Sequence, residues 1–169
     1  QRCNLNCFYC HHEGEAGAGD EMSVDEIIRI ARIAHALGVR RIKYTGGEPL
    51  LRGDLPEIIR KTSALGMEDT AITTNGSLLK GKANLLRAAG LRRLNLSLPS
   101  LKPEVYLSLT GGHLKDAIDG ASDASKSGIE VKINVVIMKG VNESETEGFI
   151  GFAQSIGGSL QIIELEDLG

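Results

Sequence analysis

The stretch SVDEIIRIARIAHALGVRRIKY, residues 23–44, contains one complete unit of the pattern that decides the fold. Ser23 and Glu26 have the spacing of a capping box, and the apolar residues after them recur at the spacing of an amphipathic helix. Gly38 is typical of a helix end, and the run 39–44 after it predicts a short strand. The stretch therefore predicts a helix followed directly by a strand.

The same order of elements recurs four more times along the chain. Further helices are predicted at 54–65, 82–89, 114–127 and 143–156, and further strands at 70–74, 94–98, 131–138 and 160–165, with 103–112 as a longer connection. Each predicted helix is followed by a glycine, at intervals close to the roughly 30 residues of a βαβ unit. This alternation predicts an α/β fold with parallel strands.

An open doubly wound sheet and a partial or full β/α barrel both fit this alternation. Parallel strands covered on both faces are nearly continuous apolar runs, whereas these strands carry polar residues at alternate positions. The pairs are Lys43 and Thr45, Thr73 and Asn75, Asn95 and Ser97, Lys132 and Asn134, and Glu164 and Glu166. Period-two spacing places each pair on one side of its strand, so we expect a polar barrel interior. The alternative is that the pairs only mark strand ends or satisfied core positions.

Length and composition indicate a single globular domain, residues 1–169, with 41% hydrophobic and 24% charged residues. The net charge of -3 gives no sign of a nucleic-acid or anionic-membrane partner. No apolar run approaches the roughly 20 residues that span a bilayer, and no signal-peptide pattern is present. We expect a cytoplasmic protein with no nucleic-acid and no membrane partner. We interpret both ends of the sequence as positions at which a longer protein has been cut.

All three cysteines, Cys3, Cys7 and Cys10, lie within the first ten residues, with the spacing CxxxCxxC. Three thiols cannot all pair into disulfides, so a shared metal ion or cluster is the simplest interpretation. Structural zinc usually takes four protein ligands, whereas an iron–sulfur cluster can leave one iron without a protein ligand. A zinc loop with His11 or His12 as fourth ligand is the alternative.

The sequence Thr45-Gly46-Gly47-Glu48-Pro49 directly follows the strand predicted at 39–44. Glycines let the backbone approach a ligand closely, and proline stiffens the exit of the loop. The glutamate can accept a hydrogen bond from an ammonium group. As a bare turn, GGEP is a weak signal, and its specificity comes from the cysteine motif ahead of it.

Together, the CxxxCxxC and GGEP loops resemble those of the radical S-adenosylmethionine (radical SAM) superfamily. The resemblance implies that Cys3, Cys7 and Cys10 bind a 4Fe-4S cluster whose open iron is chelated by S-adenosylmethionine. It further implies that the loop of Gly46, Gly47 and Glu48 holds the amino group of this cofactor. The fold it implies is a partial TIM-type β/α barrel of about six βα units, whose first strand would precede Gln1.

The chain also resembles one family within this superfamily, the molybdenum cofactor biosynthesis protein A family of GTP 3',8-cyclases. The similar segments are RCNLNCFYC, KYTGGEPLLR, ITTNG, NLSLPSL, LTGG and VKINVVIMKGVN. They occur in the family's order and cover essentially the whole chain. The implied reaction begins molybdopterin biosynthesis: a 5'-deoxyadenosyl radical takes hydrogen from the ribose of GTP, giving 3',8-cyclo-7,8-dihydro-GTP.

The family resemblance assigns roles to individual residues. It makes Tyr9, Gly47 and Ser97 contacts of S-adenosylmethionine. It makes Lys43, Thr73 and Lys132 contacts of GTP, and inward-pointing cations suit a triphosphate. The alternatives are that Tyr9 only covers the cluster, that Ser97 and Thr73 are satisfied polar residues, and that Lys43 pairs with Glu48 or another carboxylate. No catalytic acid or base is predicted, and the expected electron donor is a ferredoxin or flavodoxin.

The chain departs from the family pattern in two respects. Glu166 stands where the family carries a methionine that contacts the cofactor. A C-terminal segment with three further cysteines and a second cluster, typical of the family, is absent from this sequence. Other interpretations are a radical SAM enzyme that modifies peptides or tetrapyrroles, and a non-enzymatic metal-binding module.

Overall fold

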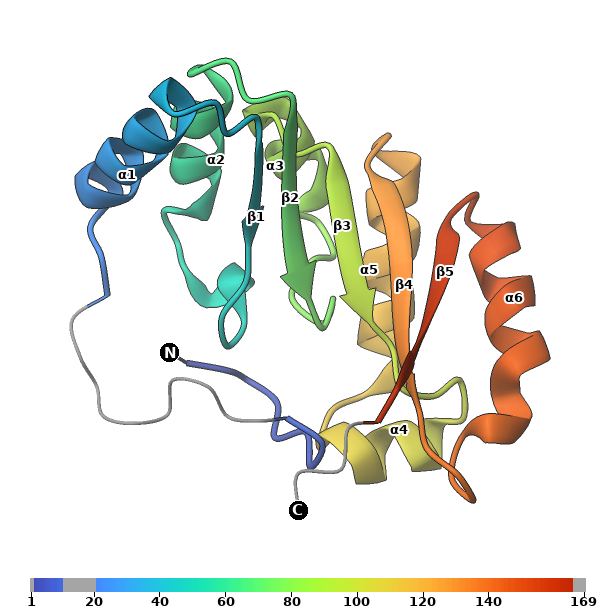
Figure 1. Cartoon of the computed structure of the whole chain (residues 1–169). Helices are drawn as coiled ribbons and strands as arrows, with labels where there is room; N and C mark the ends of the chain where they lie inside the picture. Colours follow the sequence, from blue (N-terminus) through green and yellow to red (C-terminus); the bar gives the residue numbers. More distant parts are fainter. Residues whose placement is uncertain (1, 11–20, 166–169) are drawn as a thin grey trace.

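The computed structural model describes residues 2–10 and 21–165, where five strands form one parallel sheet (Figure 1). The strands are β1 (Arg41–Tyr44), β2 (Asp69–Thr74), β3 (Arg93–Ser97), β4 (Glu130–Ile137) and β5 (Ser159–Glu164). Their order in the sheet is their order in the sequence. A doubly wound sheet reverses its strand order at a switch point, whereas a β/α barrel does not. The predicted α/β fold of partial-barrel type is confirmed, and the strand predicted ahead of Gln1 falls outside this chain.

The helices lie mainly on one face of this sheet (Figure 1). They are α1 (Val24–Ala36), α2 (Leu55–Ser63), α3 (Ala83–Ala89), α4 (Pro103–Thr110), α5 (Leu114–Lys126) and α6 (Thr146–Ser155), with short 3-10 turns η1 (Pro49–Leu51) and η2 (Glu143–Glu145). Helix α1 packs on α2. Helix α4 is the exception, because it lies across the carboxyl ends of the strands (Figure 1). In this part of the chain, no helix has the length and apolar character needed to cross a membrane.

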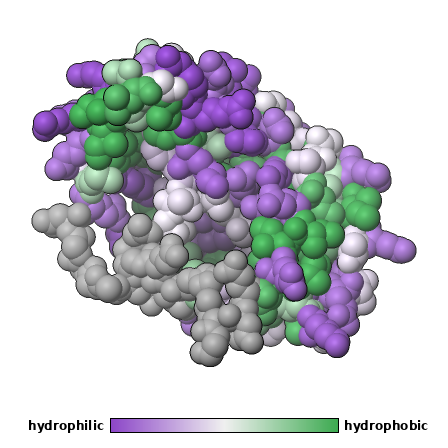
Figure 2. Space-filling view, in the orientation of Figure 1, coloured by the Kyte–Doolittle hydropathy of each residue, from purple (hydrophilic) through white to green (hydrophobic). Residues whose placement is uncertain are grey.

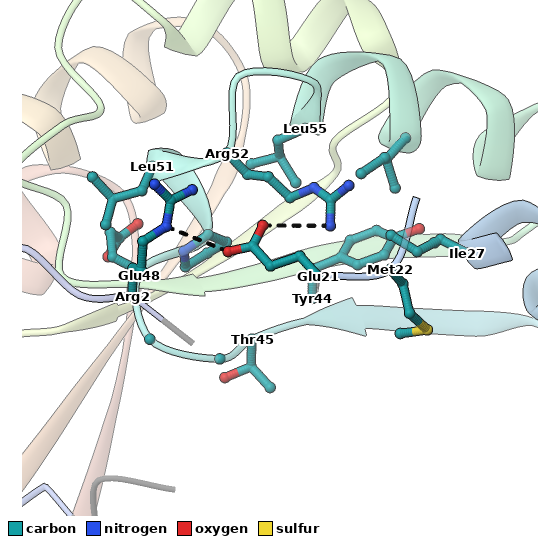
Figure 3. A pocket seen from close by; sticks show the side chains of 14 residues that line it. Arg2, Glu21, Met22, Ile27, Tyr44, Thr45, Glu48, Leu51, Arg52 and Leu55 are labelled. Carbon is teal, nitrogen blue, oxygen red and sulfur yellow. Dashed lines mark ion pairs between the residues drawn. The ribbon is translucent and has the colours of Figure 1, made fainter. Parts of the chain in front are cut away.

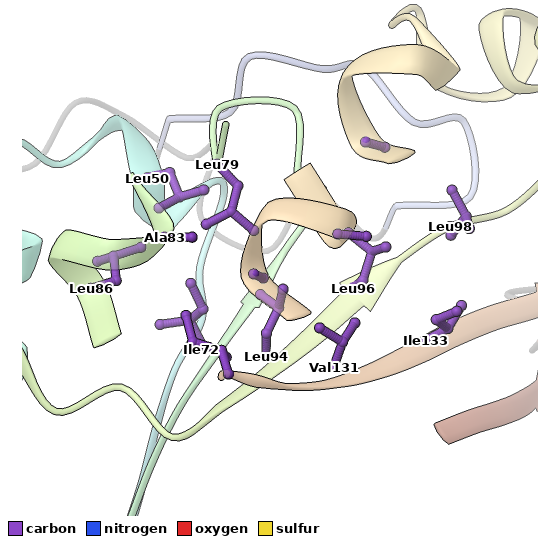
Figure 4. Close-up of a cluster of buried hydrophobic side chains, with 14 of the residues drawn as sticks. Leu50, Ile72, Leu79, Ala83, Leu86, Leu94, Leu96, Leu98, Val131 and Ile133 are labelled. Atoms are coloured by element: carbon purple, nitrogen blue, oxygen red, sulfur yellow. The ribbon is translucent and has the colours of Figure 1, made fainter. Parts of the chain in front are cut away.

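The hydrophobic core lies between the sheet and the helices (Figure 4). Ile72, Leu94 and Val131 are partners across β2, β3 and β4, and each is almost completely buried. Leu86 of α3 and Ala121 of α5 cover this row from the helix side. Burying one large apolar side chain stabilises the fold by about 1.5–3 kcal/mol. This face of the sheet therefore stabilises the fold by packing against the helices.

The predicted helix ends are confirmed. Ser23 and Glu26 form the capping box: the Glu26 amide donates to Ser23 Oγ (3.3 Å), and the Ser23 amide donates to the Glu26 carboxylate (2.8 Å). The glycines predicted to end helices all have positive φ angles. They are Gly38, Gly66, Gly90, Gly128 and Gly157.

One predicted connection is wrong, because residues 103–112 contain helix α4. Pro103 occupies its first turn and Gly111 ends it with a φ of 73°. Proline at a helix start and a left-handed glycine at its end are strong boundary signals. The helix is short and has a weak apolar periodicity, so these boundary residues are the signal that could have revealed it.

The predicted inward position of Glu164 is also wrong. The register of β4 and β5 pairs Glu164 with Ile137 and Ile162 with Val135, on the face that the helices cover. Strand β5 is an edge strand of the described sheet and is half exposed, so a polar residue is tolerated on either face. Its predicted partner Glu166 lies outside the described residues.

Candidate active site

The sheet face opposite the helices carries the predicted substrate-binding side chains. The register pairs Thr73 of β2 with Asn95 of β3, and Asn95 with Lys132 of β4. Partners in neighbouring strands lie about 4.8 Å apart with side chains on the same side, so these three form a row across the sheet. Ser97 and Asn134 are partners in the next row toward the carboxyl ends. We call these five residues the polar rows.

Lys43 of β1 lies on the same face as the polar rows. It is the partner of Ala71, which precedes Thr73 by two positions on β2. Its side chain is exposed, and no ion pair joins Lys43 to Glu48 within the described ranges. Figure 2 views the molecule from this side and shows a central hollow between hydrophobic patches over α1 and over β5. The predicted substrate residues therefore share one open face.

Residues 2–10, which carry the three cysteines and which we call the cysteine loop, are held at the carboxyl ends of the strands by helix α4. The Asn6 amide donates to the Thr110 carbonyl (2.9 Å), and the Phe8 amide donates to the Leu109 carbonyl (3.2 Å). The last carbonyls of a helix have no partner inside it, so they are available to dock another segment. Helix α4, which the sequence pattern did not reveal, is thus the support of the cysteine loop.

The three cysteines are not disulfide-bonded; Cys3 and Cys10 are exposed and Cys7 is half-buried. The Cys10 amide donates to the Cys7 carbonyl (3.0 Å), which closes a turn. Burial, with smaller contributions from the Cys3 and Cys10 thiols, raises the pKa of Cys7 to about 11, although the neighbouring Tyr9 opposes the rise. Over residues 2–10 and 21–165, no three Cys, His, Asp or Glu side chains are already gathered tightly enough to hold a metal ion. Three thiols on one loop nevertheless fit the donor set of an iron–sulfur cluster, because the irons of such a cluster are coordinated by cysteine thiolates.

Tyr9 is partly buried beside Cys7 in the cysteine loop. Burial and the neighbouring Cys7 thiol raise the pKa of Tyr9 well above its ordinary value. Its ring also packs edge-on against Phe8, with the ring centroids 5.7 Å apart. The Tyr9 ring thus packs within the cysteine loop, and its predicted contact with the cofactor stays a prediction.

The GGEP loop contacts the cysteine loop through its backbone. The Glu48 amide donates to the Arg2 carbonyl (2.8 Å). A Cβ added to Gly47 would lie 2.1 Å from this carbonyl oxygen, far inside van der Waals contact. Gly47, predicted to let a ligand approach, is therefore also required for the approach of the two loops.

The Glu48 carboxylate anchors the GGEP loop to the end of β2. The side chain is only 4% exposed and accepts hydrogen bonds from the Thr74 hydroxyl (2.7 Å), the Leu50 amide (3.0 Å) and the Asn75 amide (2.9 Å). Burial raises the pKa of Glu48, and these hydrogen bonds oppose the rise. The predicted acceptor for the cofactor's amino group is thus engaged by the chain itself. We interpret Glu48 as a positioning residue for the backbone of the loop.

A second polar connection, missed in the sequence, joins the cysteine loop to the segment after β2. Asn75 Nδ2 donates to Asn4 Oδ1 (3.1 Å), and Asn4 Nδ2 donates to Ser77 Oγ (2.9 Å). These pairs are more than 70 positions apart in the sequence, so no local pattern could reveal them. Together with Glu48, they tie three loops into one unit at the carboxyl ends of the strands.

A cavity of about 450 Å³ lies on the helix side of the GGEP loop (Figure 3). Arg2 and Arg52 both face Glu21 across it, with N–O distances of 3.5 and 3.8 Å. Gly46, Gly47 and Glu48 line it, but the predicted GTP contacts are absent from its described lining. The cavity thus lies behind the loop, and the polar rows form a separate surface.

The comparisons with known proteins agree with this arrangement. Residues 1–153 match the family model described as "Radical SAM superfamily". The chain belongs to the radical SAM superfamily. Proteins of this superfamily use a 4Fe-4S cluster together with S-adenosylmethionine. The predicted cofactors are therefore confirmed at the level of the superfamily.

This radical SAM protein is similar to archaeal proteins named "Probable GTP 3',8-cyclase". It is 45% identical to that of Methanothermobacter marburgensis over 166 residues, which are 97% of this chain and 54% of the relative. It is 46% identical to that of Thermococcus kodakarensis over 168 residues, which are 98% of this chain and 54% of the relative. The chain thus spans about half the length of these curated relatives.

Solved radical SAM structures share the fold. Streptococcus suis SuiB bound to S-adenosylmethionine superposes with a TM-score of 0.82 at 23% identity, over 98% of this chain and 37% of SuiB. Native anSMEcpe with bound AdoMet superposes with a TM-score of 0.77 at 19% identity, over 98% of this chain and 50% of that protein. At these identities the likeness shows the fold alone.

The anchor of the GGEP loop can be tested in this radical SAM protein with Thr74→Val. The Thr74 hydroxyl donates to Glu48 and accepts from the Gly76 amide (3.0 Å), so its loss leaves buried polar groups unpaired. We expect the free energy of unfolding to fall by about 1–3 kcal/mol at pH 7, measured by urea denaturation. Thr74→Ser keeps the hydroxyl and is the matched control.

The loss of stability caused by Thr74→Val should also depend on pH. Burial raises the folded-state pKa of Glu48 above its ordinary 4.5, so its contribution to stability is fully present below pH 4.5 and lost as pH rises through the folded pKa. Loss of the Thr74 donor raises this pKa further. The cost of Thr74→Val should therefore be greater at pH 7 than at pH 4, and an equal cost at both would contradict the role given to Glu48.

Proposed function

We propose that this chain is the catalytic core of a GTP 3',8-cyclase, which performs the first step of molybdenum cofactor biosynthesis. The observation that carries the proposal is the open face on which Lys43 and Lys132 lie with Thr73 on strands β1, β4 and β2. Cations placed on a sheet face without a described ion pair suit an anionic ligand such as a triphosphate. The 45% identity to a probable GTP 3',8-cyclase supports the same substrate.

In this proposal Cys3, Cys7 and Cys10 hold the 4Fe-4S cluster. When bound, the cluster supplies the electron that cleaves S-adenosylmethionine to methionine and a 5'-deoxyadenosyl radical, which takes a hydrogen atom from the ribose of GTP. The electron would come from a ferredoxin or flavodoxin. The ribose radical then closes onto C8 of the guanine, and addition of one electron from the same type of donor and one proton to the cyclised radical gives 3',8-cyclo-7,8-dihydro-GTP.

The remaining residues of the proposed site bind and orient the two small molecules. The backbone of Gly46 and Gly47 would hold the methionine end of the cofactor, with Tyr9 and Ser97 as further contacts. Lys43 and Lys132 would bind phosphate oxygens, and Thr73 would donate a hydrogen bond between them. Holding the reacting atoms close in a site closed to water is the main contribution that a protein makes to such chemistry.

The test is anaerobic incubation of the full chain, with its cluster reconstituted, with dithionite, S-adenosylmethionine and GTP. We expect 5'-deoxyadenosine and the cyclised nucleotide to form in equal amounts. GTP deuterated on the ribose should transfer deuterium to 5'-deoxyadenosine, as measured by mass spectrometry. Formation of 5'-deoxyadenosine without any change in GTP would exclude this substrate and leave the superfamily assignment intact.

A further inference from the structure

Asn95 is a buried side chain whose amide oxygen has no partner. It lies on the central strand of the described sheet and is 7% exposed, and its Oδ1 forms no hydrogen bond within residues 2–10 and 21–165. Leaving a buried polar group unpaired costs about 1–3 kcal/mol, and native proteins rarely do so without a reason. An apolar residue here would stabilise the chain, so the asparagine requires a functional explanation.

The position of Asn95 links it to the proposed substrate site. It lies in the first polar row, between Thr73 on one neighbouring strand and Lys132 on the other. In the next row, the Oδ1 of Asn134 is likewise buried and without a partner among the described residues. Two unpaired amide oxygens on adjacent strands point to a ligand that brings hydrogen-bond donors to this face.

The chemistry of the amide narrows the choice of ligand group. A phosphate offers mainly acceptor oxygens, which cannot pair with Oδ1. A hydroxyl can donate a hydrogen bond to Oδ1 in the orientation that the structure shows. In a nucleoside triphosphate, the donors nearest the phosphates are the ribose hydroxyls. Lys132, which would hold a phosphate, lies one strand away, at a spacing of about 4.8 Å.

We propose that Asn95 binds a ribose hydroxyl of the nucleotide substrate and so makes the site selective for ribonucleotides. This inference rests on the proposed function, because it takes GTP as the ligand of the polar rows. It adds a specificity-determining residue on β3 to the contacts on β1, β2 and β4. It also explains why an unpaired polar group is retained in the middle of the sheet.

The test measures binding rather than turnover. The full chain with its cluster reconstituted is titrated anaerobically with GTP, 2'-deoxy-GTP and 3'-deoxy-GTP by calorimetry. The wild type should bind GTP roughly tenfold or more tightly than at least one deoxy analogue, because a site built for a hydroxyl rejects a ligand that lacks it. Asn95→Leu should lower the affinity for GTP to that of this analogue and abolish the discrimination.

Two further variants test whether the discrimination between GTP and its deoxy analogue depends on an acceptor atom at position 95. Asn95→Asp keeps an acceptor for a hydroxyl and should retain most of the discrimination. Asn84→Leu is the matched control, because Asn84 is an exposed asparagine on α3, and it should behave as wild type. Asn95→Leu should also melt at the same or a higher temperature than wild type, since it removes an unpaired buried polar group.

The outcomes that would contradict this inference can be distinguished from the one that would contradict the proposed function as well. Discrimination that survives Asn95→Leu would overturn the inference. Loss of all GTP binding in Asn95→Asp would also overturn it, because the new charge would then be facing a phosphate. A wild type that cleaves S-adenosylmethionine but binds no GTP would overturn the proposed function and this inference with it.

Discussion

The Cys7→Ala variant will assemble no 4Fe-4S cluster and cleave no S-adenosylmethionine, while the chain stays folded. Cys7 is the middle ligand of the proposed set, and the irons of such a cluster are held by cysteine thiolates. The loop itself depends on backbone hydrogen bonds from Asn6 and Phe8 to the end of α4, which the substitution leaves in place. Loss of function should therefore occur without loss of structure.

The measurement is anaerobic reconstitution with iron and sulfide, followed by iron analysis, the visible spectrum and assay of 5'-deoxyadenosine. We expect iron content and 5'-deoxyadenosine to fall to background, with the unfolding midpoint of the apo-protein unchanged. Ser108→Ala, on the surface of α4, serves as the control. A full iron complement in Cys7→Ala would contradict the ligand assignment, and a colourless zinc-binding wild type would favour the structural metal site.

The second large effect is expected from Gly47→Ala. The added methyl group would lie 2.1 Å from the Arg2 carbonyl oxygen and 2.5 Å from its carbon, so the GGEP loop and the cysteine loop must move apart. This movement would break the hydrogen bond from the Glu48 amide to Arg2. Because the two loops together carry the proposed cofactor contacts, a displacement of about 1 Å can cost on the order of a hundredfold in rate.

Gly53→Ala is the matched control, since a Cβ at Gly53 meets no atom within 4 Å and Gly53 is not in the left-handed region. Initial rates of 5'-deoxyadenosine formation and the affinity for S-adenosylmethionine should drop in Gly47→Ala and stay unchanged in Gly53→Ala. Equal rates in the two variants would show that the loop contact is not needed for the cofactor.

Local patterns in the sequence predicted much of this arrangement. The helical spacing of apolar residues and the glycines that follow each helix predicted α1, α2, α3, α5 and α6 and the strands between them. The alternation of polar residues correctly placed Thr73, Asn95 and Lys132 on one face, because side chains on a strand alternate strictly. The same rule failed at Glu164, where the exposed edge of β5 tolerates a polar residue on either side.

The sequence by itself determined the alternation of helices and strands apart from α4, the parallel sheet and the close spacing of the three thiols, because each depends on neighbours along the chain. Only the tertiary structure decided what holds that site in place. The support of the cysteine loop on Thr110, the engagement of Glu48 by Thr74 and the unpaired amide of Asn95 all involve residues that are distant in sequence. Their partners are set by how the strands and loops meet at the carboxyl end of the sheet, which no local pattern records.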